Sequence, residues 1–297
     1  MNARPAPTLV LLSLASALAV GCAHTPRTKP PIVAPRAEPA RLELFEWERG
    51  LALRSLSERE PLSMYLWFYE WRLFDALEPG EWTQAEYDWP RGVASDGQSA
   101  WIQADMLRLE ARVRGDAVEL ELKVENSSEH AWPEHASIIA CFNPGPPATK
   151  PYEMGHHKST YFVGEHGLER LPDRDFHFRA SLRESLETRA PELKFDFSER
   201  WRTSARDDHG GLLLRTSQSE RWSCGVAWED WLGVQAHNPW LCMHVATRVG
   251  PLAPGERRSV RGRLVLLEGS REAALERLRA PWELGRELGR ERSPDAR

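Results

Sequence analysis

The sequence has few cysteines and lacks the short motifs of several enzyme classes. Only four cysteines occur in 297 residues, and none are spaced as CxxC, so neither a zinc ribbon nor a thioredoxin-type site is indicated. No GxSxG, HExxH or GxxxxGKS/T segment occurs, which removes the motif evidence for a serine hydrolase, a zincin or a P-loop enzyme. Lysine and arginine number 39 against 44 acidic residues, so the net charge of -5 argues against a nucleic-acid partner.

Apolar residues make up 41% of the chain and charged residues 28%, a balance typical of a packed globular protein. The 22 prolines and 20 glycines are not periodic, which excludes a collagen-like chain. Beyond the N-terminus, no apolar run approaches the ~20 residues that a membrane-spanning helix needs. The composition therefore predicts a globular protein with at most a terminal membrane anchor.

Residues 1–21 have the features of a bacterial signal peptide. Arg4 precedes an apolar run from Leu9 to Val20, which is about half the ~20 residues of a spanning helix. The run ends in Ala19-Val20-Gly21-Cys22, which resembles the lipobox of bacterial lipoproteins, although leucine is more usual at the position of Ala19. The resemblance implies that Cys22 is lipidated and becomes the new N-terminus. The alternative is an ordinary secretory signal that is cleaved nearby.

Residues 22–40 follow as a linker that is rich in proline and has no apolar periodicity. Such segments adopt extended polyproline II structure, so the linker is expected to hold the folded part away from the membrane. The folded part is predicted to be one domain over residues 41–297, because no internal linker interrupts it. The expected location is the bacterial cell envelope, anchored by lipid and facing the periplasm or the exterior.

Cys141, Cys224 and Cys242 remain after Cys22. The compartment after export is oxidising, so one disulfide and one leftover thiol are expected, with three possible pairings. Of these, Cys224 with Cys242 is favoured.

Two neighbouring segments show the alternation of a half-buried strand. In Met106–Arg114 and Ala117–Asn126, apolar residues alternate with Arg, Glu and Lys. Gly115-Asp116 lies between them and suits a type II′ turn, which predicts an antiparallel hairpin with one face in water.

The rest of the domain reads as many short strands followed by turn residues. Ser259–Leu267 is predicted to be a terminal strand, and residues 270–288 a C-terminal helix that is broken near Pro281. A short helix is expected within Ser181–Leu193. The fold class is therefore all-β, a large antiparallel β-sandwich with a short C-terminal helix. Five further short segments are expected to be strands: Ala136–Phe142, Tyr161–Val163, Gly211–Arg215, Trp222–Trp228 and Trp240–Val249.

The predicted strand Trp240–Val249 has two different faces. Its apolar face carries Met243 and Val245, whereas Trp240, Cys242 and His244 share the other face. An aromatic ring beside an imidazole suits an open binding surface. The alternative is a strand buried on both sides, with Cys242 in a disulfide and His244 hydrogen-bonded inside the fold.

Acidic residues follow the predicted strand Trp222–Trp228. If this strand neighbours the His244 strand, Glu229, Asp230 or both would lie near His237 and His244, which gives a carboxylate–imidazole pair for acid–base catalysis. Asp230 is a candidate binding residue there. The alternative is that both acidic residues are simply exposed at a strand end.

The 13 tryptophans suit core packing, yet indole rings also stack on sugar rings. Candidate platforms are Trp231 and Trp240, with Trp89 and Trp101 in the loop-like segment 88–105. The first part of that segment, residues 88–99, is expected to be a mobile rim. His156 and His157 are adjacent and would point to opposite faces of a strand, so no metal site is predicted. The sequence indicates no cofactor.

Three features together resemble the β-supersandwich domains of the galactose-mutarotase-like class. They are the hairpin that leads to Asn126-Ser127-Ser128, the later strand with Trp240 and His244, and the Pro254-Gly255-Glu256 turn before a final strand. The resemblance implies a sheet face that binds or processes sugar, in some members through a histidine and a carboxylate. Two functions are therefore carried forward. One is an envelope lipoprotein whose sandwich binds or processes carbohydrate, and the alternative is a non-catalytic structural or partner-binding lipoprotein.

Overall fold

A computed structural model describes residues 41–47, 50–57, 62–67, 89–104, 106–144, 154–155, 159–189, 202–238 and 241–279. The predicted signal peptide, Cys22 and the proline-rich linker lie outside these residues, so their assignment stays a prediction. In the described part, none of the helices combines the length and apolar character needed to cross a membrane.

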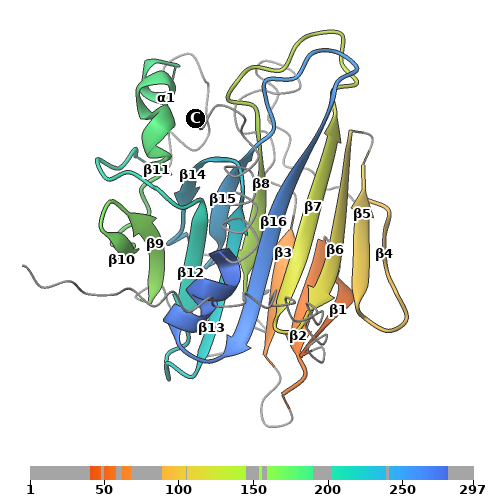
Figure 1. The fold of residues 1–297 in the computed structure, drawn as a ribbon, viewed down its shortest axis with the longest axis vertical. Helices are drawn as coiled ribbons and strands as arrows, with labels where there is room; N and C mark the ends of the chain where they lie inside the picture. The colour runs from red at the N-terminus through yellow and green to blue at the C-terminus, as the bar shows by residue number, and fades with distance from the viewer. Residues whose placement is uncertain are drawn as a thin grey trace, which may run out of the picture. The chain divides into compact units, whose positions relative to one another are not determined.

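The described strands form two antiparallel sheets (Figure 1). The seven-stranded sheet has the order β1-β2-β3-β8-β15-β14-β11, and the nine-stranded sheet β10-β9-β12-β13-β16-β7-β6-β5-β4. The all-β antiparallel sandwich predicted from the sequence is therefore confirmed. The strands of the seven-stranded sheet are β1 (Leu42–Trp47), β2 (Gly50–Ser55), β3 (Ser63–Trp67), β8 (Ser137–Asn143), β11 (His177–Phe178), β14 (Trp231–Gln235) and β15 (Met243–Arg248). Those of the nine-stranded sheet are β4 (Arg91–Val93), β5 (Ser99–Gln103), β6 (Leu107–Arg114), β7 (Ala117–Glu125), β9 (Thr160–Gly164), β10 (Gly167–Arg170), β12 (Leu212–Thr216), β13 (Trp222–Trp228) and β16 (Arg257–Glu268).

The predicted hairpin is β6 and β7, and it has the expected register. Val113 pairs with Val118 across the turn, and Gly115 has a φ of 61°, as the first central residue of a type II′ turn requires. The predicted terminal strand is β16, which lies in the middle of the sheet between β13 and β7 (Figure 1). Strands that are far apart in sequence therefore form the centre of this sheet.

The main core lies between the two sheets and takes one face from each. Leu109 and Leu122 of the hairpin contribute to it, as do Phe142 of β8 and Val245 of β15. The strands β8, β12, β13 and β14 are buried along their whole length, so they have a second covered face as well. These strands lack polar alternation because neither face meets water.

Short helices cover the outer faces of the sheets in two places. A 3-10 turn η2 (Ala180–Leu182) leads into α1 (Arg183–Arg189), where Leu186 packs on Ile139 of β8. A helix at 271–279 packs Leu278 on the nine-stranded sheet, where a Cβ on Gly225 would lie only 2.7 Å from Leu278 Cδ1. The glycine is thus required for this close approach. Both predicted helices are confirmed within the described residues, and residues 280–288 of the second prediction lie outside them.

Two sequence predictions are wrong. The segment 88–105 was expected to be loop-like, with residues 88–99 as a mobile rim, but it contains β4 and β5, because Ala100 and Ile102 alternate inward and join the core. The strand Trp222–Trp228 was considered as a neighbour of the His244 strand, yet β13 and β15 belong to different sheets. The missed strand β14 pairs with β15 instead.

Candidate functional site

The carboxylate and imidazole proposed for acid–base catalysis lie at opposite ends of β14. His244 pairs with Gln235 at the end of β14, whereas Glu229 precedes its first residue, Trp231. Six residues of extended chain separate positions 229 and 235, which is about 20 Å at ~3.3 Å per residue. Glu229 instead accepts hydrogen bonds from the backbone N–H (2.7 Å) and Nε (2.8 Å) of Arg261. The structure therefore does not bring Glu229 and His244 together.

Asp230 and Trp231 lie beneath arginines rather than on an open platform. The Asp230 carboxylate forms ion pairs with Arg179 (2.8 Å), Arg248 (3.7 Å) and Arg258. The Arg179 guanidinium lies 4.3 Å from the centroid of the Trp231 ring, and Trp231 is only 6% exposed. Both candidate binding residues thus have structural partners that hold the two sheets together at this end.

His237 is partly buried and follows β14 with a φ of 66°, in the left-handed region. Trp240, His156 and His157 lie outside the described residues, so the structure does not place these predicted groups. Trp89 precedes β4 and packs against the main core. Of the predicted sugar platforms, Trp101 alone lies on a solvent-facing hollow that the described residues form.

The predicted disulfide between Cys224 and Cys242 is wrong. Among the described residues, Cys141, Cys224 and Cys242 are buried and none of them is joined in a disulfide. Cys224 belongs to β13 of the nine-stranded sheet, whereas Cys242 comes just before β15 of the seven-stranded sheet. Burial raises the pKa of the Cys224 thiol to about 12, so this group stays protonated.

The structure brings Cys242 close to Cys141 and His244 instead. The sulfur atoms of both cysteines and a ring nitrogen of His244 lie within 4.8 Å of one another, and all three residues are buried. Cys141 of β8 is the register partner of His244 on β15, so the two side chains share one face. The sequence placed Cys242 and His244 on one strand face, but the pairing with β8 that adds Cys141 is long-range.

The tautomer of His244 follows from its neighbour Gln235. The Gln235 amide nitrogen donates to the backbone carbonyl of Arg174 at 3.1 Å, which turns its oxygen toward His244. That oxygen lies 2.9 Å from His244 Nδ1 and can only accept, so Nδ1 carries the hydrogen. In the neutral ring, Nε2 is then the nitrogen without a hydrogen, and its lone pair is the one that a metal ion would bind.

Arg215 is a fully buried cation at the end of β12. Its Nε donates to Thr160 Oγ1 at 3.0 Å and its Nη1 to the backbone carbonyl of Leu241 at 2.6 Å. Burial lowers the pKa of Arg215, because a charged guanidinium is disfavoured away from water. Within the described residues, none of the ion pairs includes Arg215, and its Nη2 has no hydrogen-bond partner.

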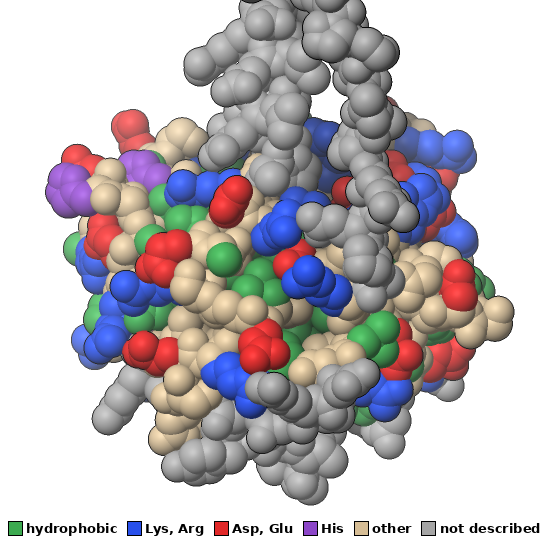
Figure 2. All heavy atoms as spheres, turned by 60° about the horizontal axis from the view of Figure 1, so that its bottom comes forward, with side chains coloured by type: hydrophobic (Ala, Val, Ile, Leu, Met, Phe, Trp, Pro, Cys, Tyr) green, Lys and Arg blue, Asp and Glu red, His purple; other side chains and the backbone are tan. Residues whose placement is uncertain are grey.

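A hollowed surface runs along the outer face of the nine-stranded sheet, over β4, β5, β6, β7 and β16. We call it the outer groove, and it consists of three adjoining hollows of about 330, 510 and 360 Å³. Figure 2, turned by 60° so that the bottom of Figure 1 comes forward, shows a surface on which basic and acidic side chains are interspersed. The outer groove is lined mainly by the outward residues of the strands, namely Trp101, Arg108, Glu110, Arg112, Glu119, Glu121, Lys123, Ser259 and Arg261.

Trp101 lies flat on the sheet at one end of the outer groove. A Cβ on Gly92 of the neighbouring strand would lie 2.9 Å from Trp101 Nε1, so the ring occupies the space above this glycine. The Arg108 guanidinium lies 5.4 Å from the ring centroid. The partly exposed ring and an adjacent hydrogen-bond donor thus face the same hollow.

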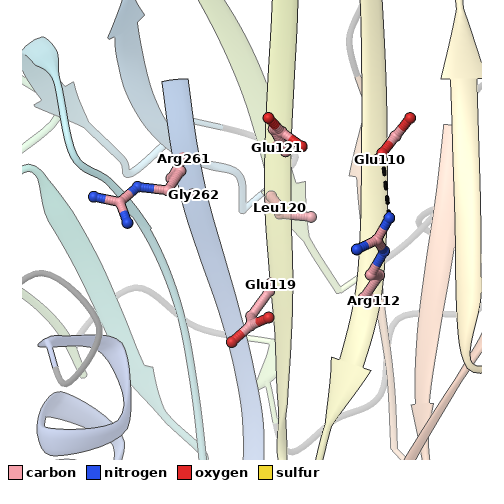
Figure 3. A pocket seen from close by; sticks show the side chains of 7 residues that line it. All are labelled: Glu110, Arg112, Glu119, Leu120, Glu121, Arg261 and Gly262. Carbon is pink, nitrogen blue, oxygen red and sulfur yellow. Dashed lines mark ion pairs between the residues drawn. The ribbon is translucent and has the colours of Figure 1, made fainter. Parts of the chain in front are cut away.

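Glu110 is the central charge of the outer groove. It forms ion pairs with Arg108 (2.9 Å), Lys123 (3.4 Å) and Arg112 (3.6 Å), the last of which is drawn in Figure 3. The hydrogen bond from Arg108 is the main reason why the pKa of Glu110 lies below its ordinary value. Glu119, Glu121 and Arg261 extend the charged lining over β7 and β16 (Figure 3).

Comparisons with known proteins give structural likeness only. No protein-family model and no curated protein matches the sequence. Similar solved structures include a galactose mutarotase related enzyme from Lactobacillus acidophilus, with 9% identity, a TM-score of 0.42, and coverage of 77% of this chain and 98% of that one. A galactose mutarotase-like protein from Lactobacillus casei has 10% identity, a TM-score of 0.43, and coverage of 77% and 98%. Both bear the name of the class that the sequence resembles, but a likeness this distant assigns neither substrate nor site residues.

Proposed function

We propose that this chain is a lipid-anchored envelope protein whose β-sandwich binds carbohydrate in the outer groove without processing it. The observation that carries the proposal is Trp101, a partly exposed ring laid flat on Gly92 in a hollow lined by charged side chains. Indole rings stack on the apolar faces of sugars. Carboxylates accept hydrogen bonds from sugar hydroxyls, and guanidinium groups donate hydrogen bonds to them. The outer groove contains both kinds of group.

The proposal does not include turnover because of where the predicted catalytic residues lie. Glu229 and His244 are separated by the length of β14, and His244 is only 1% exposed. An acid–base pair must reach one bound substrate at hydrogen-bond distance, which these positions do not allow. Binding alone is therefore the function that the described geometry supports.

The binding proposal is tested with a glycan array and the full mature protein in detergent micelles. Trp101→Ala is expected to abolish specific binding, whereas Trp101→Phe should retain part of it because a ring remains. His244→Ala and Trp240→Ala are the comparison variants, since His244 is buried in the seven-stranded sheet and Trp240 is the platform predicted from the sequence. Loss of binding in Trp240→Ala with full binding in Trp101→Ala would move the carbohydrate site elsewhere.

The mixed charge of the outer groove also favours a second candidate function, docking of a protein partner with alternating charges. A folded wild-type protein that is silent on the array would support this candidate and reject carbohydrate binding. Crosslinking from a photoreactive residue at position 119 in living cells would then identify the partner.

The lipid anchor is tested separately at Cys22. Cys22→Ser is expected to release the protein from the membrane fraction and to prevent labelling by a clickable fatty acid. Cys224→Ser is the matched control, because it removes a cysteine inside the domain. Equal membrane release and equal labelling in wild type and Cys22→Ser would establish ordinary secretory processing instead.

A further inference from the structure

We propose that Cys141, Cys242 and His244 form a binding site for a thiophilic metal ion, namely Cu⁺. Cys141 lies on β8, His244 on the adjacent strand β15 and Cys242 just before β15, and their three ligand atoms lie within 4.8 Å of one another. A metal bonded to two sulfurs at about 2.3 Å holds them at most about 4.6 Å apart, so small side-chain rotations complete the site. Two thiolates and an imidazole are soft or borderline ligands, which select Cu⁺ or Zn²⁺ over Mg²⁺ or Ca²⁺.

The groups around the three ligands orient them as metal ligands require. His244 donates its Nδ1 hydrogen to the Gln235 oxygen at 2.9 Å, and the Gln235 amide is itself held by the carbonyl of Arg174. A hydrogen bond of this kind fixes the ring and presents Nε2 to the metal. Asn143 donates from Nδ2 to Cys141 Sγ at 3.4 Å, a bond that supports a thiolate.

The charge of the surroundings decides between the two soft ions. Arg215 is fully buried, donates from Nη1 at 2.6 Å to the backbone carbonyl of Leu241, the residue before Cys242, and pairs with no carboxylate among the described residues. A buried cation requires a compensating negative charge. Cu⁺ with two thiolates and a neutral imidazole has a net charge of -1, which Arg215 cancels. Zn²⁺ would leave the buried cluster with the uncompensated charge of Arg215.

Binding involves no redox step. Each of the two cysteines loses its S–H proton to solvent, two Cu–S bonds and one Cu–N bond form, and the ion stays Cu⁺. Cys224 stays outside the site on β13, and its protonated thiol contributes no charge. It therefore provides a matched control for substitution of a buried cysteine by serine.

The experiment titrates Cu⁺ and Zn²⁺ into the reduced full mature protein under anaerobic conditions, each against a chromophoric chelator. We expect one Cu⁺ per chain, bound more tightly than Zn²⁺, with X-ray absorption showing two sulfur neighbours and one nitrogen neighbour. Cys141→Ser, Cys242→Ser and His244→Gln should each weaken Cu⁺ binding by more than about 100-fold, because each removes a direct ligand. Gln235→Leu should weaken it by about 10- to 100-fold, as loss of an orienting partner does.

Cys224→Ser should bind Cu⁺ as wild type does, and circular dichroism checks that every variant is folded. Wild-type protein that binds no metal, or binds it equally well in Cys141→Ser, would overturn the site. Tighter binding of Zn²⁺ would overturn the assignment to copper. A Cys141–Cys242 disulfide, mapped by differential alkylation of protein from cells, would show that the pair is structural. These results are independent of the glycan array, because no ligand of the metal site lines the outer groove.

Discussion

The outer face of the nine-stranded sheet is open at β6 and β7, whereas the outer face of the seven-stranded sheet is covered at β8 and β15. At the open face, Glu119 and Glu121 alternate with core residues and line the outer groove. At the covered face, Ile139 packs under α1, and Cys141 and His244 are buried. The comparison teaches that polar side chains have different roles on the two faces. They are solvated on one, and on the other each requires a specific partner.

The largest expected difference is in the loss of unfolding free energy when an outward-facing residue is replaced on each of two central strands. Ile139→Ala on β8 should lower the free energy of unfolding by about 2–5 kcal/mol, because it empties a packed position under α1. Glu119→Ala on β7 should change it by less than about 0.5 kcal/mol, since the side chain is in water. Urea unfolding followed by circular dichroism measures both. Similar losses in the two variants would show that the faces do not differ in cover.

The next largest effect is the pH dependence of the unfolding free energy that arises from Asp208, a fully buried carboxyl. Burial raises its pKa to about 7, although it accepts hydrogen bonds from the N–H groups of Gly211 (2.9 Å) and Gly210 (3.5 Å). In the unfolded chain the pKa is near 3.8. The folded state therefore binds the proton more tightly, and the stability from this group is full below about pH 4 and is lost as pH rises through 7.

Asp208→Asn keeps a hydrogen-bond acceptor and removes the titration. Relative to this variant, the wild type should lose on the order of 2–3 kcal/mol of unfolding free energy between pH 5 and pH 8. The measurement is urea unfolding of both proteins at several pH values. Glu165→Gln serves as a control for loss of an exposed carboxyl. Parallel pH profiles for wild type and Asp208→Asn would mean that Asp208 is ionised in the folded protein.

The same difference between the faces explains what could be predicted from the sequence. The hairpin of β6 and β7 was predicted to within a residue or two, because one wet face makes its period of two visible. The strand β14 was missed, because Trp231–Gln235 is buried on both faces and has no alternation. The segment that contains β4 and β5 was predicted to be a loop, because the glycines and polar residues of 88–105 outnumber the few inward-facing apolar residues that alternate in these short strands.

The candidate sites could be predicted only in part, because they depend on which strands pair over long distances in the chain and not on residue type alone. Trp101 was named from its residue type, but its place on the outer groove depends on Gly92 and on the neighbouring strand β6. Cys242 and His244 were assigned to one face of their strand, whereas Cys141 reaches them through the pairing of β8 with β15, about a hundred residues apart in the chain. The spacing of residues within one segment cannot predict which residue of a distant strand pairs with it.

The smallest expected effect belongs to Glu110 on the open face. Arg108 lowers its pKa, so the stability that this pair contributes is present above the ordinary value of 4.5 and is lost as pH falls through the folded value. Exposed ion pairs are worth only about 0.2–1 kcal/mol and are screened by salt. Glu110→Gln should therefore lower the free energy of unfolding at pH 7 by less than about 1 kcal/mol, and 1 M NaCl should remove most of the difference. A larger loss that persists in salt would mean that the outer groove is not solvated, which would also remove the basis for ligand binding there.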